Sequence, residues 1–541
     1  MNQFLKKRRI AYYIILISFL FWADSCKSTR IKTGDLDINY TEIEEQSLRE
    51  ALRPVRPGVP GKTPFWNNYA KQFIYAPSFN FNQSSNSKKY KFVVAASDSL
   101  KYEFFADHSW ADLSPVWENM PQGFARVEVF GLGTGDSIVE LCGSREFYKA
   151  SPFQGPYHAP VMKYDESAKQ ALSYLFNRDY IRSWEHRALP DSTYELYCYP
   201  AKIIGAITES MLLFSKLSPE HEKAALSIAK NAAKYLISIS EPKGAPLEFL
   251  PPTYAGEART AKNFKDQFMM IYPAKIALTY LDLFDITQEN EFKDAAVRIA
   301  ETYLKLQLPS GTWKLKLRKD GSPVTDNDCI PLDIIQLFDR LVDQYRLQTC
   351  QASRDRAFSW IMDNPVITFD WSGQFEDIAP LEPYKNLSKD EASALAVYLF
   401  GRSDENDGYT ELAEELLRFC EDQFVIWENP MPQKQYNVSE WITPCVLEQY
   451  SCYEPINASA SNMMESFLKA YEVTGKAIYL AKAVELANAM TVAQIPENGR
   501  YPTYWQLNER RIEGSGWIDW LNCTSYSAKI MFKMAEFINR K

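Results

Sequence analysis

From about residue 160 to the C-terminal end, apolar positions recur every three to four residues between polar ones. This period is typical of amphipathic helices. It predicts twelve helices, at about 165–187, 201–217, 221–239, 273–285, 291–307, 331–347, 354–363, 389–401, 409–424, 460–473, 477–493 and 523–539. The first and last lack a sequence neighbour, so we expect them to pair. Six hairpins closed in this way form an (α/α)6 toroid over 160–541.

The connections between these helices alternate in length. Within hairpins they are short, as at 217–220 and 474–476. The connections between hairpins are long, at 240–272, 308–330, 364–388, 425–459 and 494–522. Long loops are uncommon in compact domains unless they carry function. In a toroid they emerge on one rim, so we expect the functional site on that face.

Two internal repeats support this interpretation. Tyr199-Pro200-Ala201-Lys202-Ile203 recurs 73 residues later as Tyr272-Pro273-Ala274-Lys275-Ile276, and 296–313 aligns with 483–501. Proline in a first helical turn marks the start of a helix. We therefore interpret the first repeat as mainly architectural, with Gly311 and Gly499 marking turns in the second.

A different pattern precedes the helices, over 63–155. Short β-rich runs at 90–95 and 125–132 are bounded by Gly, Pro, Asp and Ser. They predict a small β-sandwich similar to a fibronectin-like module. The glycine-rich segment 131–135 has no helix behind it, so it is expected to be a hairpin loop and not a phosphate cradle.

The N-terminal segment has the features of an export signal. Basic residues at 6–9 precede an apolar stretch at 10–22, which at 13 residues is too short to span a bilayer. Ser25-Cys26 resembles a bacterial lipobox, although Asp24 and Ala23 depart from the strict pattern. This predicts a signal peptide over 1–25, lipidation of Cys26 and a tether over 26–62; the alternative is a plain signal peptide.

Composition excludes several classes of function. The net charge is −9, and no basic run follows the signal, so nucleic acid is not an expected partner. Four histidines occur, none at ligand spacing, and the cysteines form no CxxC motif. The sequence therefore implies no metal and no organic cofactor, while its 14% aromatic content suits either a helical core or sugar platforms.

The repeat and loop pattern resembles the six-hairpin glycosidase-like enzymes and the polysaccharide lyases with toroid folds. Together with the lipobox, it is similar to the glycan-degrading lipoproteins of Bacteroidetes. The resemblance implies a carbohydrate polymer or oligosaccharide as partner and a lipid-anchored place in the cell envelope. No family's catalytic signature is found, and fold alone does not fix function.

Glycoside hydrolysis needs two carboxyl groups flanking the scissile bond. The rim loops offer four candidates: Glu376, Asp377, Glu440 and Glu448. Aromatic residues beside them are candidates for binding sugar faces: Trp371, Tyr384, Trp441, Tyr450, Trp505 and Trp517. The alternative for each is structural, since such acids also cap helices and such rings also pack a rim.

Two other functions stay open. A uronate lyase or epimerase would use a tyrosine base, for which Tyr384, Tyr450 and Tyr453 are candidates, with Arg259 and Lys265 to hold the uronate carboxylate. A non-catalytic glycan-binding lipoprotein would need the aromatics alone. Acids outnumber credible bases in the rim loops, so the sequence favours a glycoside hydrolase.

Overall fold

The computed structural model describes residues 30–33, 36–55, 69–97, 99–376, 384–508 and 518–540. The predicted sites Cys26, Asp377 and Trp517 lie outside these residues. Among the helices in the described ranges, none has the length and apolar composition needed to cross a bilayer.

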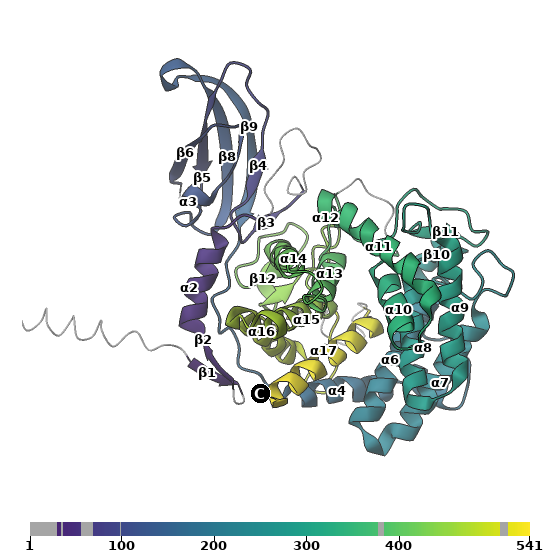
Figure 1. The fold of residues 1–541 in the computed structure, drawn as a ribbon. Coiled ribbons are helices and arrows are strands. Elements are labelled where there is room, and N and C mark those ends of the chain that lie inside the picture. The colour runs from purple at the N-terminus through teal and green to yellow at the C-terminus, as the bar shows by residue number, and fades with distance from the viewer. Residues whose placement is uncertain are drawn as a thin grey trace, which may run out of the picture.

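Six helical hairpins close into a ring (Figure 1). Each pairs an inner helix, named first, with an outer one: α17 (Leu521–Arg540) with α4 (Tyr164–Phe176), α6 (Pro200–Leu217) with α7 (Glu222–Ile239), α8 (Tyr272–Thr287) with α9 (Asn290–Leu306), α10 (Leu332–Asp343) with α11 (Gln351–Asp363), α13 (Asp390–Phe400) with α14 (Gly408–Phe424), and α15 (Asn457–Thr474) with α16 (Ala477–Ala493). The inner helices contact one another in the order α6, α8, α10, α13, α15, α17 and back to α6. The predicted (α/α)6 toroid is confirmed, and so is the pairing of its first and last helices.

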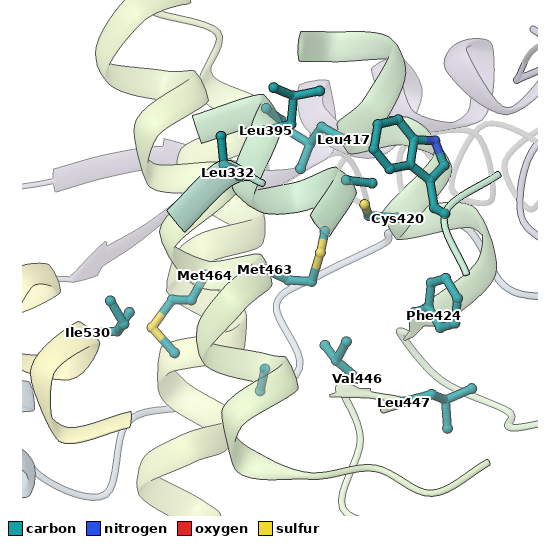
Figure 2. Packing of buried hydrophobic residues seen from close by; sticks show 14 of the residues in the cluster. Leu332, Leu395, Leu417, Cys420, Phe424, Val446, Leu447, Met463, Met464 and Ile530 are labelled. Carbon is teal, nitrogen blue, oxygen red and sulfur yellow. The ribbon is translucent and has the colours of Figure 1, made fainter. Parts of the chain in front are cut away.

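The core of the toroid lies between the two layers of helices. Figure 2 shows part of it, where side chains from α10, α13, α14, α15 and α17 meet. Met463 and Met464 of α15 and Leu395 of α13 are at most 1% exposed. Burying such side chains stabilises a fold by about 1.5–3 kcal/mol each, and this packing holds the inner helices in place around the axis.

Both copies of the first repeat begin a helix, as predicted. Pro200 and Pro273 stand in the first turns of α6 and α8. Gly311 and Gly499 adopt φ values of 103° and 74°, which favour glycine, and a Cβ on Gly311 would lie 2.5 Å from the Arg356 carbonyl oxygen.

The β-rich region forms a five-stranded sheet in the order β3-β9-β8-β5-β6. Its strands are β3 (Gln72–Phe73), β5 (Lys89–Ala95), β6 (Lys101–Ala106), β8 (Gly123–Leu132) and β9 (Ile138–Lys149). A ribbon of β4 (Ser78–Asn80) and β7 (Trp110–Asp112) packs on the sheet through Phe79, whose ring lies 5.4 Å from that of Phe147. Of the segment 131–135, Gly131 and Leu132 end β8, and 133–135 lie in its connection to the antiparallel strand β9.

The segment predicted as a tether is folded in part. The ribbon β1 (Arg30–Thr33) and β2 (Leu36–Asn39) leads into α2 (Tyr40–Ala51), which packs against α16 (Figure 1). Tyr40, Ile43 and Ala51 are buried on one face of α2, and Tyr40 Oη donates to Glu485 at 2.5 Å. The apolar spacing of this short helix explains why the segment packs on the toroid.

Candidate functional site

A cavity of about 600 Å³ lies on the axis of the toroid, because all six inner helices contribute to its lining. The lining residues come largely from the first turns of these helices, such as Lys202 of α6, Asp333 of α10 and Asn522 of α17. The long connections between hairpins also line it, through residues such as Glu376 and Glu448. The cavity therefore lies at the end of the toroid where the long loops were expected.

The walls of this cavity are rich in charge. Its acidic lining residues are Glu209, Asp333, Glu376, Asp390, Glu391 and Glu448, and its basic ones are Lys202, Lys275 and Lys389. The amino-terminal ends of the inner helices point toward the same space, and helix dipoles stabilise nearby anions there. Burial opposes this effect by disfavouring the charged forms, so each carboxyl depends on its own neighbours.

Glu376 is held in its ionised form. It follows α12 (Pro365–Thr368), is 5% exposed, and pairs through Oε1 with Lys202, while Tyr272 donates to Oε2 at 2.5 Å. Tyr254 and Lys316 each donate to its backbone carbonyl at 2.7 Å. Burial alone would raise the pKa of Glu376, but Lys202 and Tyr272 outweigh it and hold that pKa below its ordinary value.

Glu448 has the opposite environment. It follows β13 (Cys445–Val446), and Lys389 donates to its backbone carbonyl at 3.2 Å. Burial raises the pKa of the Glu448 carboxyl, against the lowering effects of Cys452 and Lys389. Burial also raises the pKa of the Cys523 thiol to about 12, and Glu448 and Glu376 both add to that rise. Both glutamates therefore influence the same thiol, Cys523, which also lines the cavity.

A second acidic group lies at the start of α13. Lys389 Nζ pairs with Asp390 Oδ1 at 2.6 Å. The neighbouring Glu391 has its pKa raised to about 8, first by burial and then by Asp390. On α10, burial likewise raises the pKa of Asp333, although Lys275 lies 3.6 Å away. On this side of the cavity, Glu391 can therefore hold its proton at neutral pH.

Chemically, the cavity combines Glu376, whose pKa is lowered, with other carboxyl groups whose pKa values are raised, Glu448 and Glu391 among them. Groups with pKa values pushed apart in one site are the usual basis of acid and base roles. The arrangement can give a proton to a bound oxygen and can stabilise a positive charge.

The other predicted acid lies elsewhere. Glu440, in the short 3-10 helix Val438–Glu440, is half-buried outside the cavity lining and accepts a bond from Asn508 at 3.0 Å. The structure thus brings together Glu376 and Glu448 but not Glu440.

The predicted aromatic platforms need correction. Trp371, Trp441 and Trp505 are at most 5% exposed and do not line the cavity. Trp371 packs edge-on against Phe369, with ring centres 6.0 Å apart. Tyr384 and Tyr450 are buried too, and Tyr384 donates to the Thr368 carbonyl at 2.7 Å. These rings pack inside the rim loops. Burying their large apolar area stabilises the loops.

The candidates for a uronate lyase are likewise occupied elsewhere. Tyr450 donates to Gln423, and Tyr453 donates to Gln72 at 3.2 Å. Arg259 pairs with Glu195 at 3.3 Å, and Lys265 with Glu257 at 3.5 Å. The cavity lining includes none of these four candidates among the residues that the structure describes.

Sequence reasoning missed several cavity residues. Lys202 and Lys275 stand at equivalent places in the Tyr-Pro-Ala-Lys repeat, where the proline drew attention to architecture alone. Asp390 and Glu391 resemble ordinary acids of a first helical turn. Trp520 lines the cavity, with Lys202 Nζ 4.4 Å from its ring centre. The lysine recurs in both copies of the repeat, and this recurrence could have identified it as a cavity residue.

Within the described ranges, no group of three or more His, Cys, Asp or Glu residues has the arrangement of a metal site. Cys445 and Cys452, whose spacing would permit a disulfide, are both free thiols.

No protein-family model and no curated protein sequence matches this chain. Solved structures are similar to it at low identity. A family 76 glycoside hydrolase from a bovine Bacteroides thetaiotaomicron strain is 10% identical, with a TM-score of 0.46, over 86% of this chain and 98% of its own. A cellobiose 2-epimerase from Spirochaeta thermophila is 12% identical, with a TM-score of 0.44, over 69% of this chain and 98% of its own.

An unsaturated glucuronyl hydrolase from Streptococcus agalactiae is 9% identical, with a TM-score of 0.46, over 70% of this chain and 94% of its own. Likeness at this distance does not transfer an activity. The arrangement of the six hairpins itself establishes the toroid, and the cavity is the feature that bears on function.

Proposed function

We propose that this protein is a carbohydrate-active enzyme that hydrolyses glycosidic bonds in the axial cavity, with Glu448 as general acid and Glu376 as its carboxylate partner. One observation carries the proposal. Two carboxyl groups from neighbouring long loops line one cavity, and their surroundings shift their pKa values in opposite directions.

In the proposed reaction, one carboxyl group donates a proton and the other accepts one. Glu448 gives its proton to the glycosidic oxygen, and the bond from that oxygen to the anomeric carbon breaks. Glu376 stabilises the positive charge on the anomeric carbon and takes a proton from the water that attacks it. Lys202 and Tyr272 hold Glu376 in place and ionised, so they act as positioning residues.

Elimination from a uronate is less well supported, because the cavity tyrosines are protonated donors. Tyr272 donates to Glu376, and Tyr526 donates to Glu465 at 2.7 Å. Burial raises the pKa of Tyr504 and, together with Glu465, that of Tyr526. A lyase or epimerase base would have to lose its proton more easily.

The test is a screen of the purified protein on neutral and uronate-containing polysaccharides. New reducing ends without ultraviolet absorbance from an unsaturated product, abolished by Glu448→Gln and Glu376→Gln, are expected. Both signals together would indicate a lyase instead. Glycan binding without cleavage across the panel would leave a binding protein and end the hydrolase proposal.

We also propose that the protein is lipid-anchored in the cell envelope through Cys26, on the strength of the basic, apolar and Ser25-Cys26 pattern. Metabolic labelling with a radioactive fatty acid should mark the wild-type protein and not Cys26→Ser. Equal labelling of both would remove this proposal without affecting the hydrolase.

A further inference from the structure

The cavity has two unlike walls. Charged residues come from α6, α8, α10 and α13, whereas α15 and α17 contribute neutral polar ones. Ser459 and Asn462 lie three positions apart on α15, Asn522 lies on α17, and all three line the cavity where these two helices pack together. The neutral wall is defined here as Ser459, Asn462 and Asn522.

The neutral wall has hydrogen-bonding atoms that the described part of the chain does not use. Ser459 is 0% exposed, and its Oγ has no hydrogen-bond partner there. Asn522 Oδ1 is buried and also without one. Leaving a buried polar atom unpaired destabilises a fold by about 1–3 kcal/mol. Such groups in a cavity wall indicate that something else completes their hydrogen bonds.

The charged wall, by contrast, has already paired its cations. Lys202 pairs with Glu376, Lys275 lies 3.6 Å from Asp333, and Lys389 lies 2.6 Å from Asp390. A carboxylate or sulfate on a sugar would therefore meet acidic side chains before any unneutralised lysine of the described lining. Like charges at close range disfavour binding.

We infer that Ser459, Asn462 and Asn522 form a subsite that hydrogen-bonds to sugar hydroxyls, and that the substrate is a neutral glycan without uronate or sulfate groups. This inference rests on the proposed function and narrows its substrate class. A sugar hydroxyl both donates and accepts hydrogen bonds, and so do a serine hydroxyl and an asparagine amide. The neutral wall therefore selects and orients the sugar, while the charged wall carries out the chemistry.

Binding to the full chain tests this directly, using saturation-transfer NMR and calorimetry. The probes are D-glucose, D-galactose, D-mannose and D-xylose, with D-glucuronate and D-galacturonate as acidic counterparts. At least one neutral sugar should bind more than tenfold tighter than the uronates. Asn462→Ala and Asn522→Ala should each weaken its binding about fivefold, the equivalent of one lost hydrogen bond.

Ser459→Ala separates recognition from folding. Removing an unpaired buried hydroxyl should leave the melting temperature unchanged or higher, yet weaken binding of the same sugar. Thr279→Val is the matched control, because Thr279 lines the opposite wall and its hydroxyl is already bonded to the Lys275 carbonyl at 3.1 Å. It should leave sugar binding unchanged.

Three results would overturn the inference: tighter binding of a uronate than of its neutral counterpart, unchanged affinity in all three variants of the neutral wall, or no sugar bound at all. The proposed function fails separately, when the wild-type protein releases no reducing ends from any polysaccharide. Cleavage that continues with unaltered KM in the neutral-wall variants would remove only the subsite.

Discussion

Lys202 and Glu376 form an ion pair across the cavity, although 174 positions separate them in the sequence. The pair joins the first turn of α6 to the loop before α13. Lys275, at the equivalent place in the repeat, lies beside another acid, Asp333. A repeat that marks the start of two helices therefore also carries two lysines into the cavity.

This ion pair should control stability as well as chemistry. Glu376→Gln leaves the Lys202 ammonium buried without its counter-charge, and breaking a buried pair in this way costs about 3–5 kcal/mol. Urea denaturation should show that loss, and adding Lys202→Met should recover most of it without restoring activity. The exposed pair of Lys265 and Glu257 is the control, where Lys265→Met should change stability by under about 1 kcal/mol. A double variant as unstable as Glu376→Gln would mean that the pair is not the cause.

Glu448 should govern turnover and its limit at high pH. Removing a general acid typically lowers kcat about 10²–10⁴-fold, so Glu448→Gln should do this on the glycan found in the screen, with little change in melting temperature. Because the Glu448 pKa is raised, wild-type activity should fall as pH rises through that pKa, when the acid loses its proton. Glu440→Gln is the matched control on a neighbouring part of the same loop, and an equal loss there would count against this assignment.

The helices were predictable because their apolar period is set by packing between two layers. Even α15, whose inner face carries Ser459 and Asn462, has enough buried residues on its other side to show the period. The cavity was predictable only in part. The loop acids Glu376 and Glu448 stood out, but the burial of Trp371 and Trp505 depends on contacts between distant segments, which a single sequence does not reveal. The pairing of Lys202 with Glu376 is hidden for the same reason.

Glu391 should make the folded protein less stable at high pH. Its pKa rises from 4.5 in the unfolded chain to about 8 in the fold, so between these values the folded state holds the extra proton. Stability must then decrease as pH rises from about 4.5 and level off above about 8. Glu391→Gln cannot ionise, so denaturation at several pH values should find it more stable than wild type near pH 9 and similar to it near pH 4. A constant difference at every pH would show that the effect is not titration of Glu391.

Asp422 should anchor the β-domain to the toroid. Its Oδ1 accepts hydrogen bonds from the backbone amides of Ile74 and Tyr75, at 2.6 and 2.8 Å, at the end of β3. Asp422→Ala leaves two buried amides unpaired, which costs about 1–3 kcal/mol for each group. Asp422→Asn keeps an acceptor, and because burial raises the Asp422 pKa to about 7, it removes only part of a full charge at neutral pH. Hydrogen exchange at the Ile74 and Tyr75 amides should therefore accelerate strongly in Asp422→Ala and little in Asp422→Asn. Equal protection in all three proteins would mean that other contacts at this interface hold β3 in place.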